Sequence, residues 1–129
     1  MNDTAKLFHL NERQPDDKRP GGRTWVFNGA EQLSIQYSEM WDPALTLHEH
    51  ENEQVNIVLG GRVLFRVGEE VFELTKGSAL RIPPNVPHGL EKKLSEEDFQ
   101  VIQLMVPKKD GLPESPRVND LGFEGWPGL

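Results

Sequence analysis

The amino-acid sequence predicts an all-β domain, either a sandwich or an antiparallel barrel. Apolar and β-branched segments recur roughly every eight to twelve residues between residues 23 and 106, the spacing typical of such folds. Turn residues such as Asn28-Gly29 separate these segments. No apolar period of about 3.6 residues persists beyond one turn, which disfavours a helical bundle. We therefore expect a single antiparallel β-barrel of about six to ten strands over residues 23–107.

The first four expected strands end at turn signals or at changes in composition. The run of residues 25–27 stops at an Asn-Gly pair, which favours a turn. Residues 33–38 alternate apolar with polar side chains, the period of a strand, until Pro43 interrupts the pattern. The extended pattern resumes over residues 44–50, and a short acidic turn separates it from residues 54–59.

Glycine and proline turns separate the remaining five expected strands. Gly60-Gly61 is a two-residue hairpin signal, and Gly68-Glu69 and Lys76-Gly77 mark the next two turns. Residues 83–87 (PPNVP) form a rigid loop with few backbone donors. These turns place strands over residues 63–67, 71–74, 79–82, 88–94 and 99–106.

The two ends of the chain are expected to lie outside the barrel. Residues 1–22 are polar and their charges cancel, which predicts a loose N-terminal arm; the alternative is an edge strand given to a partner subunit. Residues 108–129 form a C-terminal tail rich in proline and glycine. The tail is either disordered or docked through Phe123 and Trp126 onto the barrel or a second subunit.

The composition excludes several classes of protein. The chain has no cysteine, which excludes a disulfide framework, thiolate metal sites and a cysteine nucleophile. Its formal charge of −7 argues against nucleic acid or an anionic membrane as a partner. The apolar runs are too short for a membrane-spanning helix. The N-terminal residues lack the apolar stretch of a secretory signal, so we expect a cytoplasmic protein.

Three of the four histidines form a candidate metal site. On a strand, His48 and His50 would point to one face with Cα atoms about 6.6 Å apart, and both could ligate one ion. A hairpin would place Gln54 beside them, and His88, after the proline loop, could close a third side. The alternatives are a hydrogen-bonded core histidine, or an exposed His-x-His pair that binds metal weakly.

Two spaced motifs make the sequence resemble the cupin superfamily, and in particular its small single-domain metal-binding members. The motifs are His48-x-His50-x3-Gln54-x6-Gly61 and Gly77-x5-Pro83-x4-His88. The resemblance implies a jelly-roll barrel with a mononuclear metal centre. It also implies a homodimer, for which strand 99–106, apolar on both faces, offers surface to bury. The sequence departs from the usual pattern at Asp42 and Asn85, where glycine is usual, and at Gln54, where glutamate is usual; asparagine tolerates a positive φ.

The amide of Gln54 has a chemical consequence. Three neutral imidazoles and a neutral amide leave the +2 charge of the ion uncompensated, so the centre would be a strong Lewis acid toward an enolisable or oxygen-rich small molecule. Fe, Ni, Zn, Mn and Cu all suit such ligands. We expect a lyase, isomerase or cyclase; the alternatives are an Fe- or Ni-dependent dioxygenase and a non-catalytic cupin that binds a metal or small molecule. A shifted turn would make Glu53 the fourth ligand instead.

Two further polar side chains are candidates for catalytic roles. Gln103 interrupts an apolar face of strand 99–106 and is either a satisfied core amide or a hydrogen-bonding group of a substrate pocket. Asn56 shares strand parity with Gln54 and would line the same cavity. Arg66 and Arg81 would clamp a substrate carboxylate or phosphate, or else lie on the outer face of a sheet.

The motifs also resemble those of cupins that linearise unsaturated uronates. The shared residues are His48, His50, Glu53-Gln54 and residues 85–89. Those enzymes carry Asp, Phe and Arg where this chain has Gln103, Met105 and Lys109. We therefore expect Lewis-acid chemistry without an aspartate acid–base on the last strand.

Overall fold

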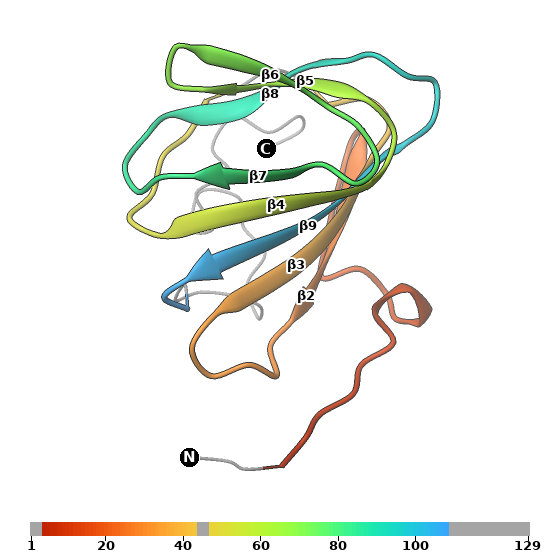
Figure 1. Ribbon diagram of the computed structural model, residues 1–129. Coiled ribbons are helices and arrows are strands. Elements are labelled where there is room, and N and C mark those ends of the chain that lie inside the picture. Colours follow the sequence, from red (N-terminus) through yellow and green to blue (C-terminus); the bar gives the residue numbers. More distant parts are fainter. Residues whose placement is uncertain (1–3, 44–46, 109–129) are drawn as a thin grey trace.

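The computed structural model describes residues 4–43 and 47–108, and these form two antiparallel sheets (Figure 1). After a 3₁₀ turn, η1 (Leu10–Glu12), the strands are β1 (Asp17–Arg19), β2 (Gly22–Phe27), β3 (Ser34–Met40), β4 (Glu53–Gly60), β5 (Val63–Val67), β6 (Glu70–Leu74), β7 (Ala79–Ile82), β8 (His88–Lys93) and β9 (Phe99–Val106). The larger sheet has the order β1-β2-β3-β9-β4-β7 and the smaller sheet β6-β5-β8. The predicted all-β antiparallel fold is confirmed, as two sheets of a jelly roll. No helix of the described residues is long and apolar enough to cross a membrane.

The interior between the sheets is apolar at one end and mainly polar at the other, where Met105 of β9 is also buried. Along β9, the inward-facing residues Phe99 and Val101 are followed by Gln103. The apolar end is a cluster of Met40, Val58, Val63, Phe65, Leu74, Ile82, Leu90, Phe99 and Val101. The polar end contains the buried side chains of Ser34, Gln36, Gln54, Asn56, His88 and Gln103. The apolar cluster supplies the hydrophobic stabilisation of the fold, so the polar end is available for another role.

Strand β3 turns its polar side chains inward. Ser34, Gln36 and Ser38 are buried, whereas Ile35 and Tyr37 on the opposite face are half-buried. The hydroxyl of Ser38 lies 2.9 Å from that of Thr24 on β2, and the two form a buried hydrogen bond. The predicted two-residue alternation is therefore present, but the apolar residues occupy the outer face.

Part of the predicted N-terminal arm belongs to the larger sheet. Strand β1 pairs with β2 of the same chain, and Asp17 and Arg19 form a buried ion pair. Burial lowers the pKa of Arg19 to about 10. Upstream, Phe8 packs edge-on against Phe27, with ring centroids 4.9 Å apart. The prediction of a loose arm is wrong for these residues, because paired charges allow a polar segment to enter a sheet.

Gly21, between β1 and β2, adopts a left-handed backbone conformation with a φ of 85°. Its carbonyl oxygen accepts hydrogen bonds from the backbone N–H groups of Trp41 and Asp42. A Cβ at this position would overlap the carbonyl oxygen of Asp42. We expect Gly21→Ala to lower the free energy of unfolding by about 2–4 kcal/mol, through backbone strain and this overlap.

The matched control for Gly21→Ala is Gly77→Ala. Gly77 has a similar φ of 90°, but among the described residues a Cβ there would meet no atom within 4 Å beyond its chain neighbours. This variant should therefore lose only about 1 kcal/mol, from the backbone conformation alone. Chemical denaturation of both variants provides the measurement, and equal losses would contradict the steric argument.

Candidate metal centre

His48 and His50 lie on an extended segment that pairs with the proline loop. His48 and His88 exchange two backbone hydrogen bonds of 3.0 and 2.9 Å, which form an isolated bridge. The N–H of Asn85 donates to the carbonyl of His50 at 2.8 Å, and Asn85 has a φ of 60°. The strand predicted over residues 44–50 is thus reduced to the bridge at His48 within the described residues. Its residues 44–46 lie outside them.

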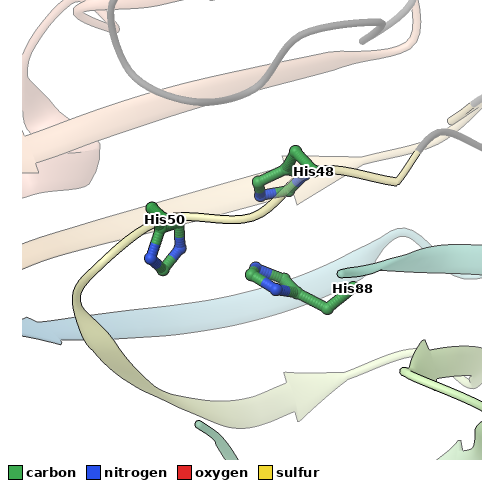
Figure 2. A group of neighbouring side chains, drawn as sticks. All are labelled: His48, His50 and His88. Atoms are coloured by element: carbon green, nitrogen blue, oxygen red, sulfur yellow. The ribbon is translucent and has the colours of Figure 1, made fainter. Parts of the chain in front are cut away.

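The three imidazoles converge on one point. Figure 2 shows His48, His50 and His88 directed toward one another from two segments that are distant in sequence. Their potential ligand atoms all lie within 4.8 Å of one another. The ring centroids are 4.4 Å apart for His48 and His88, 4.9 Å for His50 and His88, and 5.9 Å for His48 and His50. This group could hold a single metal ion.

Hydrogen bonds to backbone carbonyls orient two of the rings. Nδ1 of His88 lies 2.8 Å from the carbonyl oxygen of Val86, and Nδ1 of His50 lies 3.1 Å from that of Asn52. A carbonyl only accepts, so Nδ1 of His88 is its protonated nitrogen and Nε2 carries the lone pair, whereas His50 has an acceptor oxygen beside each ring nitrogen. Metal-ligating histidines are typically oriented by such a bond from the second ring nitrogen.

Gln54 faces His50 in an arrangement that one neutral imidazole cannot satisfy fully, because both ring nitrogens of His50 face acceptor oxygens. Nε2 of Gln54 donates to Oδ1 of Asn56 at 2.7 Å, which directs its Oε1 toward Nε2 of His50 at 2.8 Å. If His50 donates through Nδ1 to Asn52, Nε2 of His50 and Oε1 of Gln54 both carry lone pairs and repel each other. Two atoms that each bind one ion at about 2.1 Å, at right angles, lie about 3.0 Å apart. A shared cation would therefore turn this repulsion into attraction.

The acidic residues near the histidines lie outside the histidine group. Glu53, the alternative fourth ligand, forms an ion pair with Arg81. Glu49 and Glu51 are exposed. Within the described residues, no carboxylate belongs to the histidine group. The residues that the fold brings together there are neutral.

The two arginines considered as substrate clamps are engaged in ion pairs. Arg66 contacts Glu91 at 2.8 Å, and Arg81 pairs with Glu53 as described above. The Arg81 pair is largely exposed, and the Arg66 pair is about a quarter to a third exposed. These contacts favour the alternative interpretation, that both arginines serve the outer faces of the sheets.

A pocket of about 660 Å³ opens beside His50. It is lined by Glu49, His50, Glu51, Asn52, Asn85, Pro107 and Lys108. Asn52 donates from Nδ2 to the carbonyl of Pro107 at 2.6 Å, and Lys108 donates to the carbonyl of Ala30 at 2.9 Å. These two bonds hold the segment after β9 against the entrance to the histidine group.

The candidate catalytic residues Gln103 and Asn56 are both buried and lie directly opposite each other on β9 and β4. Gln36 of β3 lies opposite Gln103 and is fully buried, and sequence reasoning missed it. The inward parity of Gln36 could have been recognised only from its pairing with β9. Lys109, Phe123 and Trp126 lie outside the described residues.

Comparison with known proteins identifies similar sequences and structures. The family described as "Cupin domain" matches residues 40–106. A segment of 46 residues is 41% identical to the uncharacterised protein MJ1618 of Methanocaldococcus jannaschii, and covers 35% of this chain and 37% of that protein.

Two solved structures match over most of this chain. KdgF from a Halomonas species superposes with a TM-score of 0.75 at 26% identity, covering 85% of this chain and 100% of the other. An RmlC-like cupin from Shewanella frigidimarina superposes with a TM-score of 0.71 at 20% identity, covering 84% and 97%. The second likeness concerns the fold alone.

Proposed function

The chain belongs to the cupin family, and from this premise we propose that it is a metal-dependent enzyme. In this proposal, a divalent ion acts as a Lewis acid on a small oxygen-bearing substrate, in a non-oxidative lyase, isomerase or cyclase reaction. The similarity to KdgF extends over the full length of that chain, which supports a small single-domain protein.

The proposed ligands are His48, His50, His88 and Gln54. The observation that carries the proposal is the convergence of three imidazoles, whose potential ligand atoms lie within 4.8 Å of one another, with Oε1 of Gln54 at 2.8 Å from Nε2 of His50. A neutral His50 can donate to only one of the two oxygens that face its ring, and protonating both nitrogens would place a cation among two further imidazoles. A divalent ion satisfies all four groups at once. Fe, Ni, Zn, Mn and Cu remain candidates, because each suits imidazole and neutral oxygen ligands.

The neutral ligand set determines the proposed chemistry. When bound, a divalent ion polarises a carbonyl or hydroxyl oxygen and stabilises negative charge that develops on it. The bonds from His50 and His88 to backbone carbonyls hold the two rings in place. Asn56 holds the amide of Gln54, and Gln103 lies beside Asn56 as a further polar contact for substrate. No carboxylate of the described residues joins the histidines to reduce the charge of the ion.

A dioxygenase is the second enzyme class to test. The three-histidine group is compatible with this class too, because neutral imidazoles suit Fe and Ni as well as Zn. Oxygen consumption distinguishes the two classes.

The test uses the purified protein loaded separately with Zn, Mn, Ni and Fe(II). We expect about one ion per chain, and metal-dependent deuterium exchange at the methyl group of pyruvate, a small enolisable oxo acid that chelates through two oxygens. NMR measures the exchange under nitrogen. An oxygen electrode, with acetylacetone and catechol as substrates, tests the Fe(II) form. Oxygen uptake without exchange would favour a dioxygenase, and metal binding without either activity would favour a binding protein.

We also propose that the chain forms a homodimer through the outer face of the larger sheet. Ile35, Tyr37, Ile102 and Leu104 share this face and remain half-buried in a single chain. Light scattering at micromolar concentration should give about twice the chain mass of 14.7 kDa. Replacing Ile35 and Ile102 by lysine should shift the mass to that of one chain, because buried ammonium groups are costly. A wild-type mass near 15 kDa would contradict the dimer.

A further inference from the structure

Three amide side chains form a continuous row across the inner face of the larger sheet. Gln36 on β3 is directly opposite Gln103 on β9, and Gln103 is directly opposite Asn56 on β4. Gln36 and Asn56 are fully buried, and Gln103 is 5% exposed. We call Gln36, Gln103 and Asn56 the amide row.

Most of the hydrogen-bonding capacity of the amide row is unused by the protein. Four buried atoms of the row lack a hydrogen-bond partner among the described residues: Oε1 and Nε2 of Gln36, Oε1 of Gln103 and Nδ2 of Asn56. Buried polar groups in native proteins are normally hydrogen-bonded, since leaving them without partners destabilises the fold. Apolar side chains of similar size would fill these positions at lower cost. The row therefore has the features of a binding surface.

The amide row is connected to the candidate metal centre. Oδ1 of Asn56 accepts the hydrogen bond from Gln54, whose own oxygen faces His50. Neighbouring strands lie about 4.8 Å apart, so the row extends about 10 Å away from the Gln54 side of the sheet. The row is therefore joined to the candidate metal centre through the side chain of Gln54.

We infer that the amide row binds the uncharged, hydroxyl-bearing part of a substrate whose other end lies at the metal centre. The inference rests on the proposed function and adds the substrate class, a polyhydroxylated small molecule. A hydroxyl group both donates and accepts, which matches a row that offers acceptors on Gln36 and Gln103 and donors on Gln36 and Asn56. An anionic group would face the acceptor oxygen of Gln103. Arg66 and Arg81, which could have received an anion, are paired with glutamates.

The test compares three α-hydroxy acids that share one chelating end. Glycolate has no further groups, gluconate adds a chain of hydroxyls, and 2-hydroxyglutarate adds a second carboxylate. Calorimetric titration of the Zn- or Ni-loaded protein should show gluconate binding about tenfold more tightly than glycolate, and 2-hydroxyglutarate binding no more tightly than glycolate. Gln36→Met should remove most of the gluconate advantage and leave the affinity for glycolate unchanged, and Gln103→Met should likewise remove most of the gluconate advantage.

The matched control is Gln100→Met, on the same strand as Gln103 but on its opposite face. This variant should keep the full preference for gluconate. Because the amide of Gln36 has no partner among the described residues, Gln36→Met should retain or raise the melting temperature of the ligand-free protein. A fall of several degrees would identify a structural amide and overturn the inference.

Two failures can be told apart by the glycolate titration. Equal affinities of the wild-type protein for gluconate and glycolate would overturn the inference about the amide row, as would a gluconate preference that survives in Gln36→Met. If the protein takes up metal but no glycolate, or takes up no metal, the proposed function itself is wrong.

Discussion

The double variant His48→Ala, His50→Ala is expected to carry less than about a tenth of the metal that the wild-type chain carries. Loss of a group that only orients a metal ligand already lowers affinity by about 10–100-fold, and this variant loses two ligands outright. His88 and Gln54 alone would leave an ion half-coordinated by the protein. Elemental analysis after dialysis against a weak chelator measures the occupancy. The rate at which the methyl protons of pyruvate exchange should fall in proportion to the metal occupancy.

His9→Ala is the matched control for the double variant. His9 is the fourth histidine of the chain, exposed and outside the histidine group. It should retain wild-type metal content and activity. Circular dichroism should show the same strand signal in all three proteins, because the backbone hydrogen bonds of residues 48 and 50 do not depend on the imidazoles. Undiminished metal in the double variant would refute the site.

Gln54→Glu is expected to bind metal more tightly and to lower turnover by tenfold or more. A carboxylate adds Coulomb attraction to the ion, which raises affinity, but it also reduces the charge that the ion offers to substrate. A loss of about 1.4 kcal/mol in transition-state stabilisation corresponds to tenfold in rate. The new carboxylate also cannot donate to Oδ1 of Asn56, so the Asn56 amide must turn to present its NH₂ group. Metal affinity and pyruvate exchange, measured on the same preparation, test the two effects.

Gln54→Met separates charge from ligation. It removes the ligating oxygen at similar volume and leaves the site neutral, so affinity should fall in this variant and rise in Gln54→Glu. If Gln54 were only a core hydrogen-bonding residue, Gln54→Glu would bury an unpaired charge. The melting temperature would then fall while metal content stayed the same. Tighter binding with unchanged turnover would refute the role of charge in the proposed mechanism.

The strand-and-turn pattern predicted most of the fold because its signals are local. The predicted strand over residues 63–67 coincides with β5, and residues 99–106 coincide with β9. Strand β1 was not predicted, because a segment that contains Asp17 and Arg19 is expected to be exposed to solvent. The two side chains can be buried only because they form an ion pair with each other. The pattern of residues 48–50 predicts a strand, but the segment pairs with only the first residue of β8, His88, and with Asn85 of the loop before it, so a single bridge forms. Neither the ion pair within β1 nor the pairing partner of residues 48–50 can be recognised from the local sequence.

The candidate site was predictable where spacing carried the information. His48, His50 and His88 were found from two motifs, and the structure brings them together. Gln36 was not found, because alternation along β3 gives a period of two without saying which face is inside. Hydrophobicity would place Ile35 and Tyr37 inward, yet the serines and Gln36 are buried instead. On β3 the polar side chains face the interior and the apolar ones face outward, which is the reverse of the usual preference. This reversal can be seen only when the strands that pair with β3 are known.

Because the interior is divided into an apolar and a polar end, substitutions that affect ligand recognition are separated from substitutions that affect the packing of the sheets. Phe99 and Gln103 stand on one strand but about 13 Å apart, beyond the distance at which substitutions usually couple. Changes at Gln36, Gln103 and Asn56 can therefore alter recognition while Met40 and Phe99 keep the sheets together. A library randomised at the amide row should consist mostly of folded members. The same backbone can therefore support different substrate specificities. A change in specificity does not require accompanying substitutions in the apolar cluster.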